Sequence, residues 1–265
     1  MKINGYDYQI EISGQGNPTW VFLHGFLGSK ADFTKIVPRG TKIYITAYGF
    51  AENDATLPAH HFSTDHQVQD LAALFASLQV SSINLVGYSM GARLALAFAI
   101  QHPQLVHHLW LESGTAGIIN PDARKQRQLA DQTRATQIEQ QGLVSFVNHW
   151  ETLPLFNSQQ HVSKSQQQFM HQQRINHNPI NMANSLRYFG TGTMPNCWNQ
   201  LSQLKIPITL ITGAQDLKFT KLNQKMKALL PNADHVLVAD AGHNVHFEKS
   251  AHFTSLLNQE KLHEN

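Results

Sequence analysis

Residues 87–91, Gly-Tyr-Ser-Met-Gly, have the spacing of a serine nucleophile held on a sharp turn between a strand and a helix. The apolar run 83–86 predicts a short buried strand before the turn, and the Ala/Leu-rich run 92–100 predicts a helix after it. Such a turn strains the backbone of Ser89 and requires small residues two positions to either side. The N-terminus of the following helix offers backbone N–H groups to developing negative charge. These features together indicate a nucleophile elbow.

Two further apolar runs precede polar residues that would complete a catalytic triad in the order serine, acid, histidine. Residues 208–211 lead to Asp216, and residues 236–238 lead to His243. Open α/β sheets place their ligands beyond the carboxyl ends of the strands, so both side chains are expected at the same edge as Ser89. We predict that His243 takes the serine proton and that Asp216 orients the imidazole.

Two other acids compete with Asp216 for the orienting role. Asp240 lies three residues before His243 on the same approach, and Glu112 follows the apolar run 106–111. Asp216 is favoured because it belongs to a glycine-containing turn that follows a strand. The chain has 16 histidines, so an arbitrary one is far more often a surface residue than a catalytic residue. His243 differs because Ala-Gly-His follows a predicted strand in the expected order.

An oxyanion hole requires two backbone N–H groups, one just after the nucleophile and one from an earlier loop. Met90 would supply the first. The apolar run 20–23 ends in His24-Gly25-Phe26, so Phe26 is expected to supply the second. The alternative is that His24-Gly25 forms only a tight turn after a strand, which a glycine would serve equally well.

The alternation of short apolar runs with helical patterns predicts an α/β fold, with a mostly parallel sheet and helices on both faces. Residues 1–114 and 196–265 show this alternation, with an opening hairpin within residues 2–12 and a helix near 65–78. Residues 115–195 contain no convincing strand and are rich in Gln, Asn and His with helical periodicity. We expect this segment to be a helical cap inserted into one α/β-hydrolase-like core.

Composition limits the classes of function. With 42% hydrophobic residues among 265, the chain can bury a sizeable core, and a formal charge of +2 is too small to imply nucleic acid or an anionic membrane as partner. Cys197 is the only cysteine and has no base beside it in sequence, which favours a structural role and a reducing compartment. Residues 1–5 lack the apolar core of a signal peptide, and no run is apolar enough to span a bilayer, so we expect a cytoplasmic enzyme. No cofactor and no metal are expected.

The substrate must be inferred from the pocket, because fold and triad do not fix the reaction. Arg93 lies one helical turn after the predicted nucleophile. Arg124 and Arg127 share one helix face if Pro121 opens that helix, and Arg174 follows later in the cap. Together these guanidinium groups would suit a small molecule with several carboxylates, which they bind bidentately. The alternative is that each is a solvated surface arginine.

The chain resembles the MenH family, the 2-succinyl-6-hydroxy-2,4-cyclohexadiene-1-carboxylate synthases of menaquinone biosynthesis, from about residue 20 to 250. The cap stretches and the Asp-x-Lys-Phe element are more specific than the elbow. The matching stretches are residues 21–26, 87–93, 111–117, 124–127, 150–156, 184–187, 190–192, 216–219 and 241–246.

The resemblance implies a lyase that eliminates pyruvate from 2-succinyl-5-enolpyruvyl-6-hydroxy-3-cyclohexene-1-carboxylate. Ser89, deprotonated with help from His243, would abstract a ring proton α to the succinyl ketone. The N–H groups of Phe26 and Met90 would then hold the enolate oxygen. The resemblance also implies that the substrate is bound by Tyr88, Arg93, Arg124, Arg127, Trp150, Phe156 and Arg174.

The chain departs from the family pattern at two places. Ala92 stands where a second glycine is usual after the elbow, a change of one methyl group. Residues 46–51, after a strand expected at 42–46, read Thr-Ala-Tyr-Gly-Phe-Ala where the family commonly has Asp-x-Pro-Gly-His-Gly. This loop is expected to border the pocket, so the change bears on substrate identity. A carboxylesterase or C–C bond hydrolase, and a non-catalytic binding protein on the same fold, therefore remain alternatives.

Overall fold

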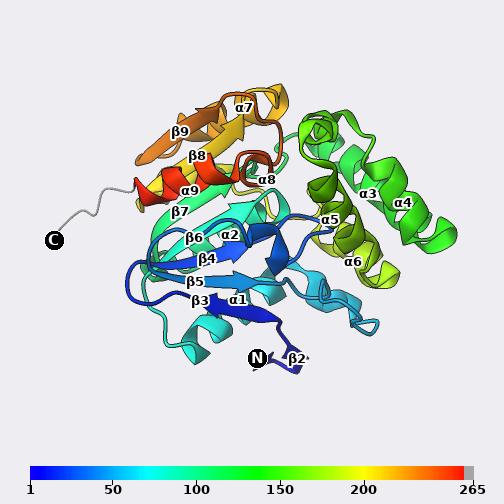
Figure 1. The fold of residues 1–265 in the computed structure, drawn as a ribbon, viewed down its shortest axis with the longest axis horizontal. Coiled ribbons are helices and arrows are strands. Elements are labelled where there is room, and N and C mark those ends of the chain that lie inside the picture. The colour runs from blue at the N-terminus through cyan, green and yellow to red at the C-terminus, as the bar shows by residue number, and fades with distance from the viewer. Residues whose placement is uncertain (260–265) are drawn as a thin grey trace.

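A seven-stranded sheet in the order β3-β5-β4-β6-β7-β8-β9 forms the centre of the molecule (Figure 1). The computed structural model describes residues 1–259. β3 is antiparallel to β5, whereas every other neighbouring pair is parallel, which confirms the predicted α/β fold. The strands are β3 (Ile10–Ser13), β4 (Thr19–Leu23), β5 (Thr41–Ile45), β6 (Ile83–Tyr88), β7 (Val106–Glu112), β8 (Ile208–Gly213) and β9 (Ala233–Val238).

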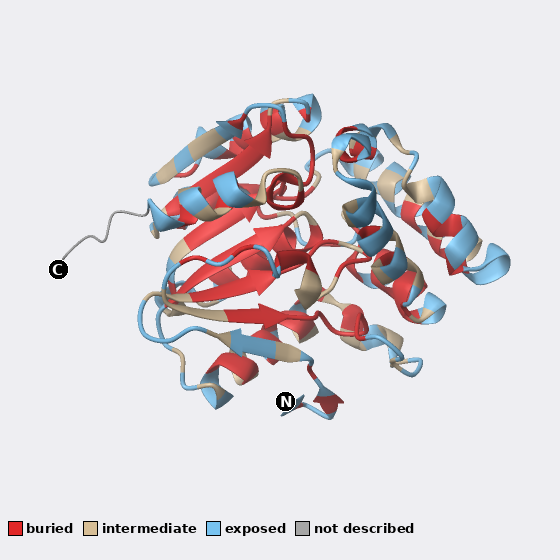
Figure 2. Ribbon diagram, in the orientation of Figure 1, coloured by how far each residue is buried: buried red, intermediate tan, exposed pale blue. Residues whose placement is uncertain are grey.

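Successive side chains of each central strand point to opposite faces of the sheet, and both faces are buried (Figure 2). Val21 and Leu23 belong to a cluster that includes α1 and α2, whereas Trp20 and Phe22 belong to one that includes η1 and α9. Burial on both faces explains why the strands form nearly continuous apolar runs in the sequence. The helices of the core are η1 (Lys30–Phe33), η2 (Ala59–Phe62), α1 (Thr64–Ser77), α2 (Met90–Gln101), η3 (Pro103–Leu105), η5 (Trp198–Gln203), α7 (Leu217–Lys227), α8 (Val245–Glu248) and α9 (Ser250–Asn258).

The opening hairpin is shorter than the sequence predicted. β1 (Lys2–Ile3) pairs with β2 (Tyr6–Asp7), and the second expected strand instead joins the main sheet as β3. Asn4 and Gly5 form the turn with φ values of 47° and 91°. Two positive φ angles in an Asn-Gly pair match the tight turns preferred in two-residue hairpins, so the chain reverses before residues 8–12 can take part.

A helical segment lies between β7 and β8, beyond the carboxyl ends of the parallel strands (Figure 1). Within the described chain, none of residues 113–207 is in a strand. Asn120 caps the helix that begins at Pro121, and Asn178 caps the helix that begins at Pro179. An asparagine cap followed by a proline in the first turn is a usual way to begin a helix. Its helices are α3 (Pro121–Gln141), α4 (Leu143–Trp150), η4 (Pro154–His161), α5 (Lys164–Ile175) and α6 (Pro179–Phe189). The expected domain bounds, with a cap at 115–195, stay a prediction.

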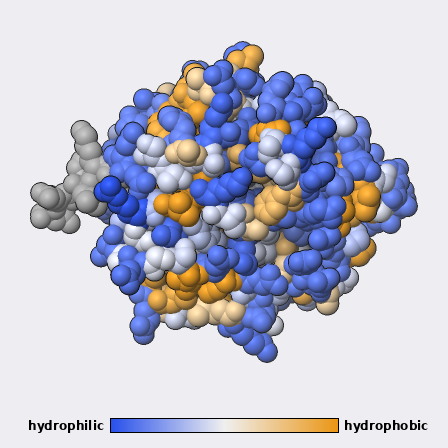
Figure 3. Space-filling view, in the orientation of Figure 1, coloured by the Kyte–Doolittle hydropathy of each residue, from blue (hydrophilic) through white to orange (hydrophobic). Residues whose placement is uncertain are grey.

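The surface is mainly polar. Figure 3 shows hydrophilic side chains over most of one face, with apolar ones in small separate groups. Among residues 1–259, no helix combines the length and the apolar character that crossing a bilayer requires. The thiol of Cys197 is buried, and burial raises its pKa to about 11, so it stays protonated at neutral pH.

Candidate active site

The turn at Ser89 connects β6 to α2 in strained backbone. Ser89 has φ 49° and ψ −100° directly before the helix begins. A Cβ at Gly87 would lie 2.5 Å from the carbonyl oxygen of Gly91, and one at Gly91 would overlap the carbonyl oxygen of Leu23. Neither backbone can move aside, so both positions require glycine. The Ser89 side chain is thereby presented at the carboxyl edge of the sheet.

Ser89, His243 and Asp216 form a hydrogen-bonded chain. His243 Nε2 lies 3.0 Å from Ser89 Oγ, and His243 Nδ1 lies 2.6 Å from Asp216 Oδ2. The other carboxylate oxygen of Asp216 accepts from the backbone N–H of Phe219 and caps α7. Because the carboxylate only accepts, Nδ1 carries the proton and Nε2 presents its lone pair to the serine hydroxyl. The arrangement can draw a proton from Ser89.

The two rival acids do not contact His243. Asp240 is exposed in the turn after β9, with a φ of 54°. Glu112 is fully buried and accepts from Nδ1 of His246 at 2.7 Å and from the backbone N–H of the same residue at 3.0 Å. Asp216 is therefore the acid that the fold places against His243.

Phe26 and Met90, whose backbone N–H groups are expected to form an oxyanion hole, line one cavity with Ser89. Met90 opens α2, where a backbone N–H has no acceptor within the helix. Phe26 lies in the turn after β4, which closes by a 3.1 Å hydrogen bond from Gly28 N–H to Gly25 O. A Cβ at Gly25 would lie 2.6 Å from the ring of Tyr88, so glycine is required there by close packing.

His24 fixes this turn from behind. Its Nε2 accepts from the backbone N–H of Ala47 at 2.9 Å, and its Nδ1 donates to the carbonyl of Gly25 at 2.7 Å. Burial lowers the pKa of His24 to about 3, so the ring stays neutral. Both nitrogens are used in the neutral form, which ties the 25–28 turn to the chain after β5.

The cavity encloses about 950 Å³, its open mouth included, between the strand edge and the inserted helices. The Trp150 and Phe156 rings lie 5.6 Å apart, and Trp150 lies 5.6 Å from the Phe26 ring, which makes one side aromatic. Its lining includes Phe26, Tyr88, Ser89, Met90, Arg93, Arg127, Trp150, Phe156, Arg174, Lys218 and His243.

Arg93 is a buried cation of this lining. It is 8% exposed, and its Nη1 donates to the carbonyl of Phe189 at 2.6 Å. Its guanidinium also lies over the Phe189 ring, 4.8 Å from the centroid. Burial and the neighbouring Arg127 lower the pKa of Arg93 to about 9, which leaves it charged at neutral pH. The carbonyl that accepts this hydrogen bond is neutral, so the charge is available to an anion.

Arg127 and Arg174 reach the cavity from the inserted helices with carboxylate partners. Arg127 Nε lies 2.9 and 2.8 Å from the two carboxylate oxygens of Asp131. Arg174 is buried and donates to Glu151 at 2.9 Å and to Gln159 at 3.2 Å. These partners hold both guanidinium groups in place at the cavity wall.

Arg124 differs from the sequence expectation. Its guanidinium donates to the carbonyls of Gly192, Thr193 and Met194 at 2.9, 3.3 and 2.9 Å. It is not among the residues that line the cavity. The chain returning from α6 presents three carbonyls that lack helical partners, and Arg124 satisfies them, so we assign it a structural role.

Two charged lining residues were not predicted. Lys218 sits at the start of α7, with its Nζ 5.6 Å from the centroid of the Phe219 ring, and that ring lies 4.5 Å from His243. Its position two residues after Asp216 is the feature of the sequence that could have identified it. Asp32 is buried at the cavity wall and accepts from Gln173 at 3.2 Å, and burial raises the pKa of its carboxyl. Nothing in the sequence around Asp32 marked it.

The loop 46–51 does not border the cavity, contrary to expectation. It lies one layer behind, where the ring of Phe50 packs 6.1 Å from Phe26 and 5.2 Å from His24. The apolar residues of this loop face the core, so its departure from the family pattern changes the support of the turn at Phe26. It does not change the cavity wall.

Comparison with known proteins places these features in context. Residues 18–250 match the model of the alpha/beta hydrolase fold family. The chain is 38% identical over 97% of its length to a Bacillus subtilis protein assigned as a 2-succinyl-6-hydroxy-2,4-cyclohexadiene-1-carboxylate synthase, and covers 95% of it. A synthase of the same name from Salmonella paratyphi C is 29% identical over 89% of this chain and 90% of that protein. The solved structure of MenH from S. aureus has 33% identity and a TM-score of 0.88, and the match covers 94% of this chain and 96% of that one.

Proposed function

We propose a function for this chain from its family: it belongs to the 2-succinyl-6-hydroxy-2,4-cyclohexadiene-1-carboxylate synthase family of the alpha/beta hydrolase fold. The proposed function is that of the lyase of the same name in menaquinone biosynthesis. Its substrate is then 2-succinyl-5-enolpyruvyl-6-hydroxy-3-cyclohexene-1-carboxylate, and its second product is pyruvate. The observation that carries the proposal is that Ser89 and His243, which is hydrogen-bonded to Asp216, line one cavity with the cations Arg93, Arg127 and Arg174.

Ser89 acts as the base in this reaction, and no water is needed. His243 takes the hydroxyl proton, and Ser89 Oγ removes the proton from ring carbon 2, α to the succinyl ketone. The C2–C3 double bond forms, the C3–C4 double bond moves to C4–C5, and the C5–oxygen bond breaks. The proton held by His243 balances protonation of the departing enolpyruvate, which becomes pyruvate. A hydrogen bond of 3.0 Å between His243 and Ser89 suits the first transfer.

The ketone oxygen gains negative charge as the ring proton leaves. Phe26 and Met90 line the same cavity as Ser89, and their backbone N–H groups would stabilise this enolate. The strained turn at Ser89 and the neutral ring of His24 keep the two donors in place before the substrate arrives. Little reorganisation is then required during the reaction.

The substrate carries carboxylates on its ring, its succinyl chain and its enolpyruvyl group. Arg93, Arg127 and Arg174 would each pair with such a group, and Lys218 adds a fourth positive charge at the wall. Tyr88, Trp150 and Phe156 supply the apolar and aromatic surface for the ring. The partner of this protein is thus a small poly-carboxylate. Its cytoplasmic localisation stays a prediction.

The decisive experiment is incubation with the enolpyruvyl substrate, with pyruvate release and diene absorbance followed together. The lyase yields both at equal rates. A nitrophenyl ester assayed in parallel tests the carboxylesterase alternative, which the triad alone would permit. Rapid ester turnover without pyruvate release would overturn the proposal in favour of a hydrolase. Inactivity in both assays would favour a binding protein.

A further inference from the structure

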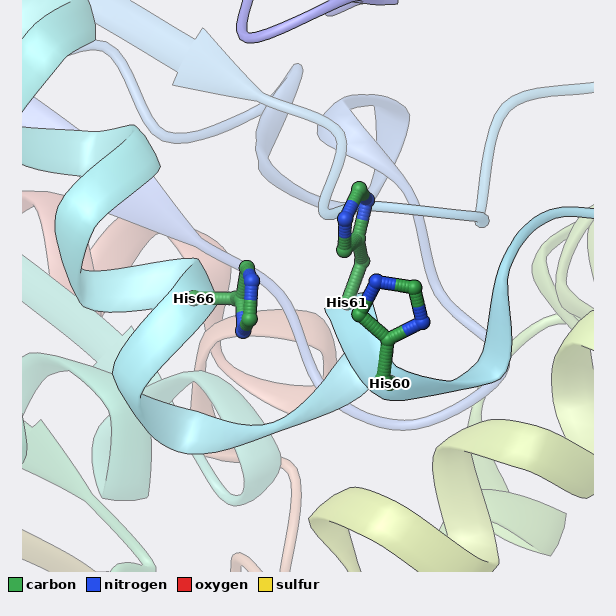
Figure 4. A group of neighbouring side chains, drawn as sticks. All are labelled: His60, His61 and His66. Atoms are coloured by element: carbon green, nitrogen blue, oxygen red, sulfur yellow. The ribbon is translucent and has the colours of Figure 1, made fainter.

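Three histidines meet away from the active-site cavity, where η2 joins α1 (Figure 4). His60 and His61 lie on η2, and His66 lies in the first turn of α1. One nitrogen from each ring can be chosen so that all lie within 4.8 Å of one another. We propose that this cluster binds a divalent transition-metal ion of the Zn²⁺ type.

The local fold brings the three rings together. Ser63 ends η2 and caps α1, and its hydroxyl accepts from the backbone N–H of His66 at 3.4 Å. Because the chain changes direction at Ser63, the first turn of α1 lies against η2. The ring centroids of His60 and His61 are 4.2 Å apart, those of His61 and His66 are 4.7 Å apart, and those of His60 and His66 are 5.6 Å apart. Small rotations of the rings would bring the nitrogens to the spacing of a common ligand sphere.

In two of these rings, Nδ1 lies within hydrogen-bond distance of a hydroxyl group. His61 Nδ1 lies 3.3 Å from Tyr48 Oη, and His66 Nδ1 lies 3.0 Å from Ser63 Oγ. Metal-ligating histidines nearly always donate their second N–H to an oxygen in this manner, which fixes the tautomer. With Nδ1–H donating to these oxygens, the Nε2 lone pairs of both rings are left for a metal ion.

The charge and accessibility of the cluster also suit a cation. Asp70, one helical turn after His66, acts on His61 with a negative charge. His60 is exposed, so an ion can enter from solvent.

The ligand set determines which ions fit. Three imidazole nitrogens suit Zn²⁺, Ni²⁺ or Cu²⁺, whereas Mg²⁺ and Ca²⁺ require oxygen ligands. None of the three histidines lines the active-site cavity, so the ion would not take part in the elimination. Its effect would be to link η2, which packs against α6, to the start of α1. Binding to the folded state alone raises thermal stability by mass action.

The test is calorimetric titration of untagged full-length protein with Zn²⁺, for the native chain, His60→Ala, His66→Gln and His252→Ala. His252 is an exposed histidine on α9 and serves as the matched control. We expect one saturable site per chain in the native protein and in His252→Ala. Loss of a ligand should weaken this site at least about tenfold in His60→Ala and His66→Gln.

Thermal unfolding gives a second measurement. Tm of the native protein should rise with Zn²⁺ concentration, that of His60→Ala should not, and Mg²⁺ should have no effect. Since His60 is exposed, His60→Ala should have the native Tm without metal, which verifies folding. Equal Zn²⁺ affinity in His60→Ala and His252→Ala, or the absence of a saturable site in the native protein, would overturn the proposal.

Discussion

His246 Nδ1 lies 2.7 Å from the carboxylate of Glu112, directly behind the active-site serine. Both side chains are completely buried, and the backbone carbonyl of Glu112 accepts from Ser89 N–H at 2.8 Å. The core therefore holds two histidine–carboxylate pairs at neighbouring strand ends. His243 reaches the cavity, whereas His246 packs between the rings of Phe33 and Tyr88.

The first prediction tests which acid orients His243. Asp216→Asn should lower kcat by up to about 10⁴ while sparing the fold, because the amide would favour the wrong tautomer of His243. Asp240→Asn, at an exposed position, is the matched control and should leave kcat unchanged. Steady-state pyruvate release checks both. A damaging Asp240→Asn with a mild Asp216→Asn would show that the acid has been misassigned.

Glu112→Gln should lower the stability of the fold. The amide cannot hold both the ring and the backbone N–H of His246 as the carboxylate does, so the free energy of unfolding should fall by about 1–3 kcal/mol. Urea denaturation measures this loss. If Glu112→Gln left unfolding unchanged and abolished turnover, the pair would have a direct role in catalysis.

Ser89 and His243 should behave as one catalytic unit. Ser89→Ala and His243→Ala should each remove most turnover, and the double variant should be little worse than either, since both residues act in the same proton transfer. The measurement is kcat for the three variants, with circular dichroism as the control for folding. Independent, multiplicative losses are the result that would contradict a shared role.

The arginines should distinguish a poly-carboxylate substrate from a neutral one. Arg93→Ala and Arg174→Ala should each lose about 1.5–3 kcal/mol of transition-state binding, or roughly ten- to over a hundredfold in kcat/KM. Arg→Lys should restore only part, because a point charge cannot form the bidentate fork. Arg124→Ala is the matched control, since its guanidinium holds backbone carbonyls outside the cavity.

These kcat/KM values should be compared with turnover of a neutral ester by the same variants. A carboxylate-binding role predicts losses confined to the enolpyruvyl substrate. Equal losses on both substrates, or losses in Arg124→Ala alone, would remove the evidence for an anion pocket.

The neutral ring of His24 should make stability depend on pH. Its pKa is about 3 in the folded chain, whereas about 6.5 is usual in an unfolded chain. Between these values the unfolded state binds the extra proton, so stability rises with pH and falls on acidification below about 6.5. His24 should contribute a loss of up to about 1.4 kcal/mol per pH unit.

His24→Gln should remove this contribution, so its free energy of unfolding should converge on that of the native chain as the pH falls from 7 to 5. His107→Gln, at an exposed position, is the control and should keep the native slope. A difference between native and His24→Gln that stays constant with pH would contradict a neutral buried ring.

Much of the sheet, and the order Ser89, Asp216, His243 along the chain, could be predicted because each depends on local pattern. Buried strands are apolar runs, and the residue after each run must lie at the carboxyl edge. Arg124 could not be placed, since its role depends on carbonyls at residues 192–194, far away in sequence. Asp32 was missed for the same reason: only the packing of α5 beside η1 puts it on the cavity wall.

The loop 46–51 and the opening hairpin show the same contrast between features set by distant contacts and features set by local sequence. Whether Phe50 faces a cavity or the core is decided by Phe26 and His24 on another strand end, which no local pattern records. The hairpin itself was predicted, and its turn at Asn4-Gly5 could have been located from the sequence, because two residues that favour positive φ lie between strand-forming ones.

Ser89 and Arg93 are carried by the same helix, the first at its N-cap and the second four residues on. A rise of 1.5 Å per residue separates their backbones by about 6 Å along the axis, whatever the inserted helices do. The distance between the Ser89 hydroxyl and a carboxylate bound by Arg93 would thus be set by a rigid element. Arg127 and Arg174 belong to other helices, so their distances from Ser89 depend on how the inserted helices pack against the core. Discrimination between substrates should accordingly be strictest for the distance between the reacting proton and the carboxylate that pairs with Arg93. It should be more permissive for the positions of the other carboxylates.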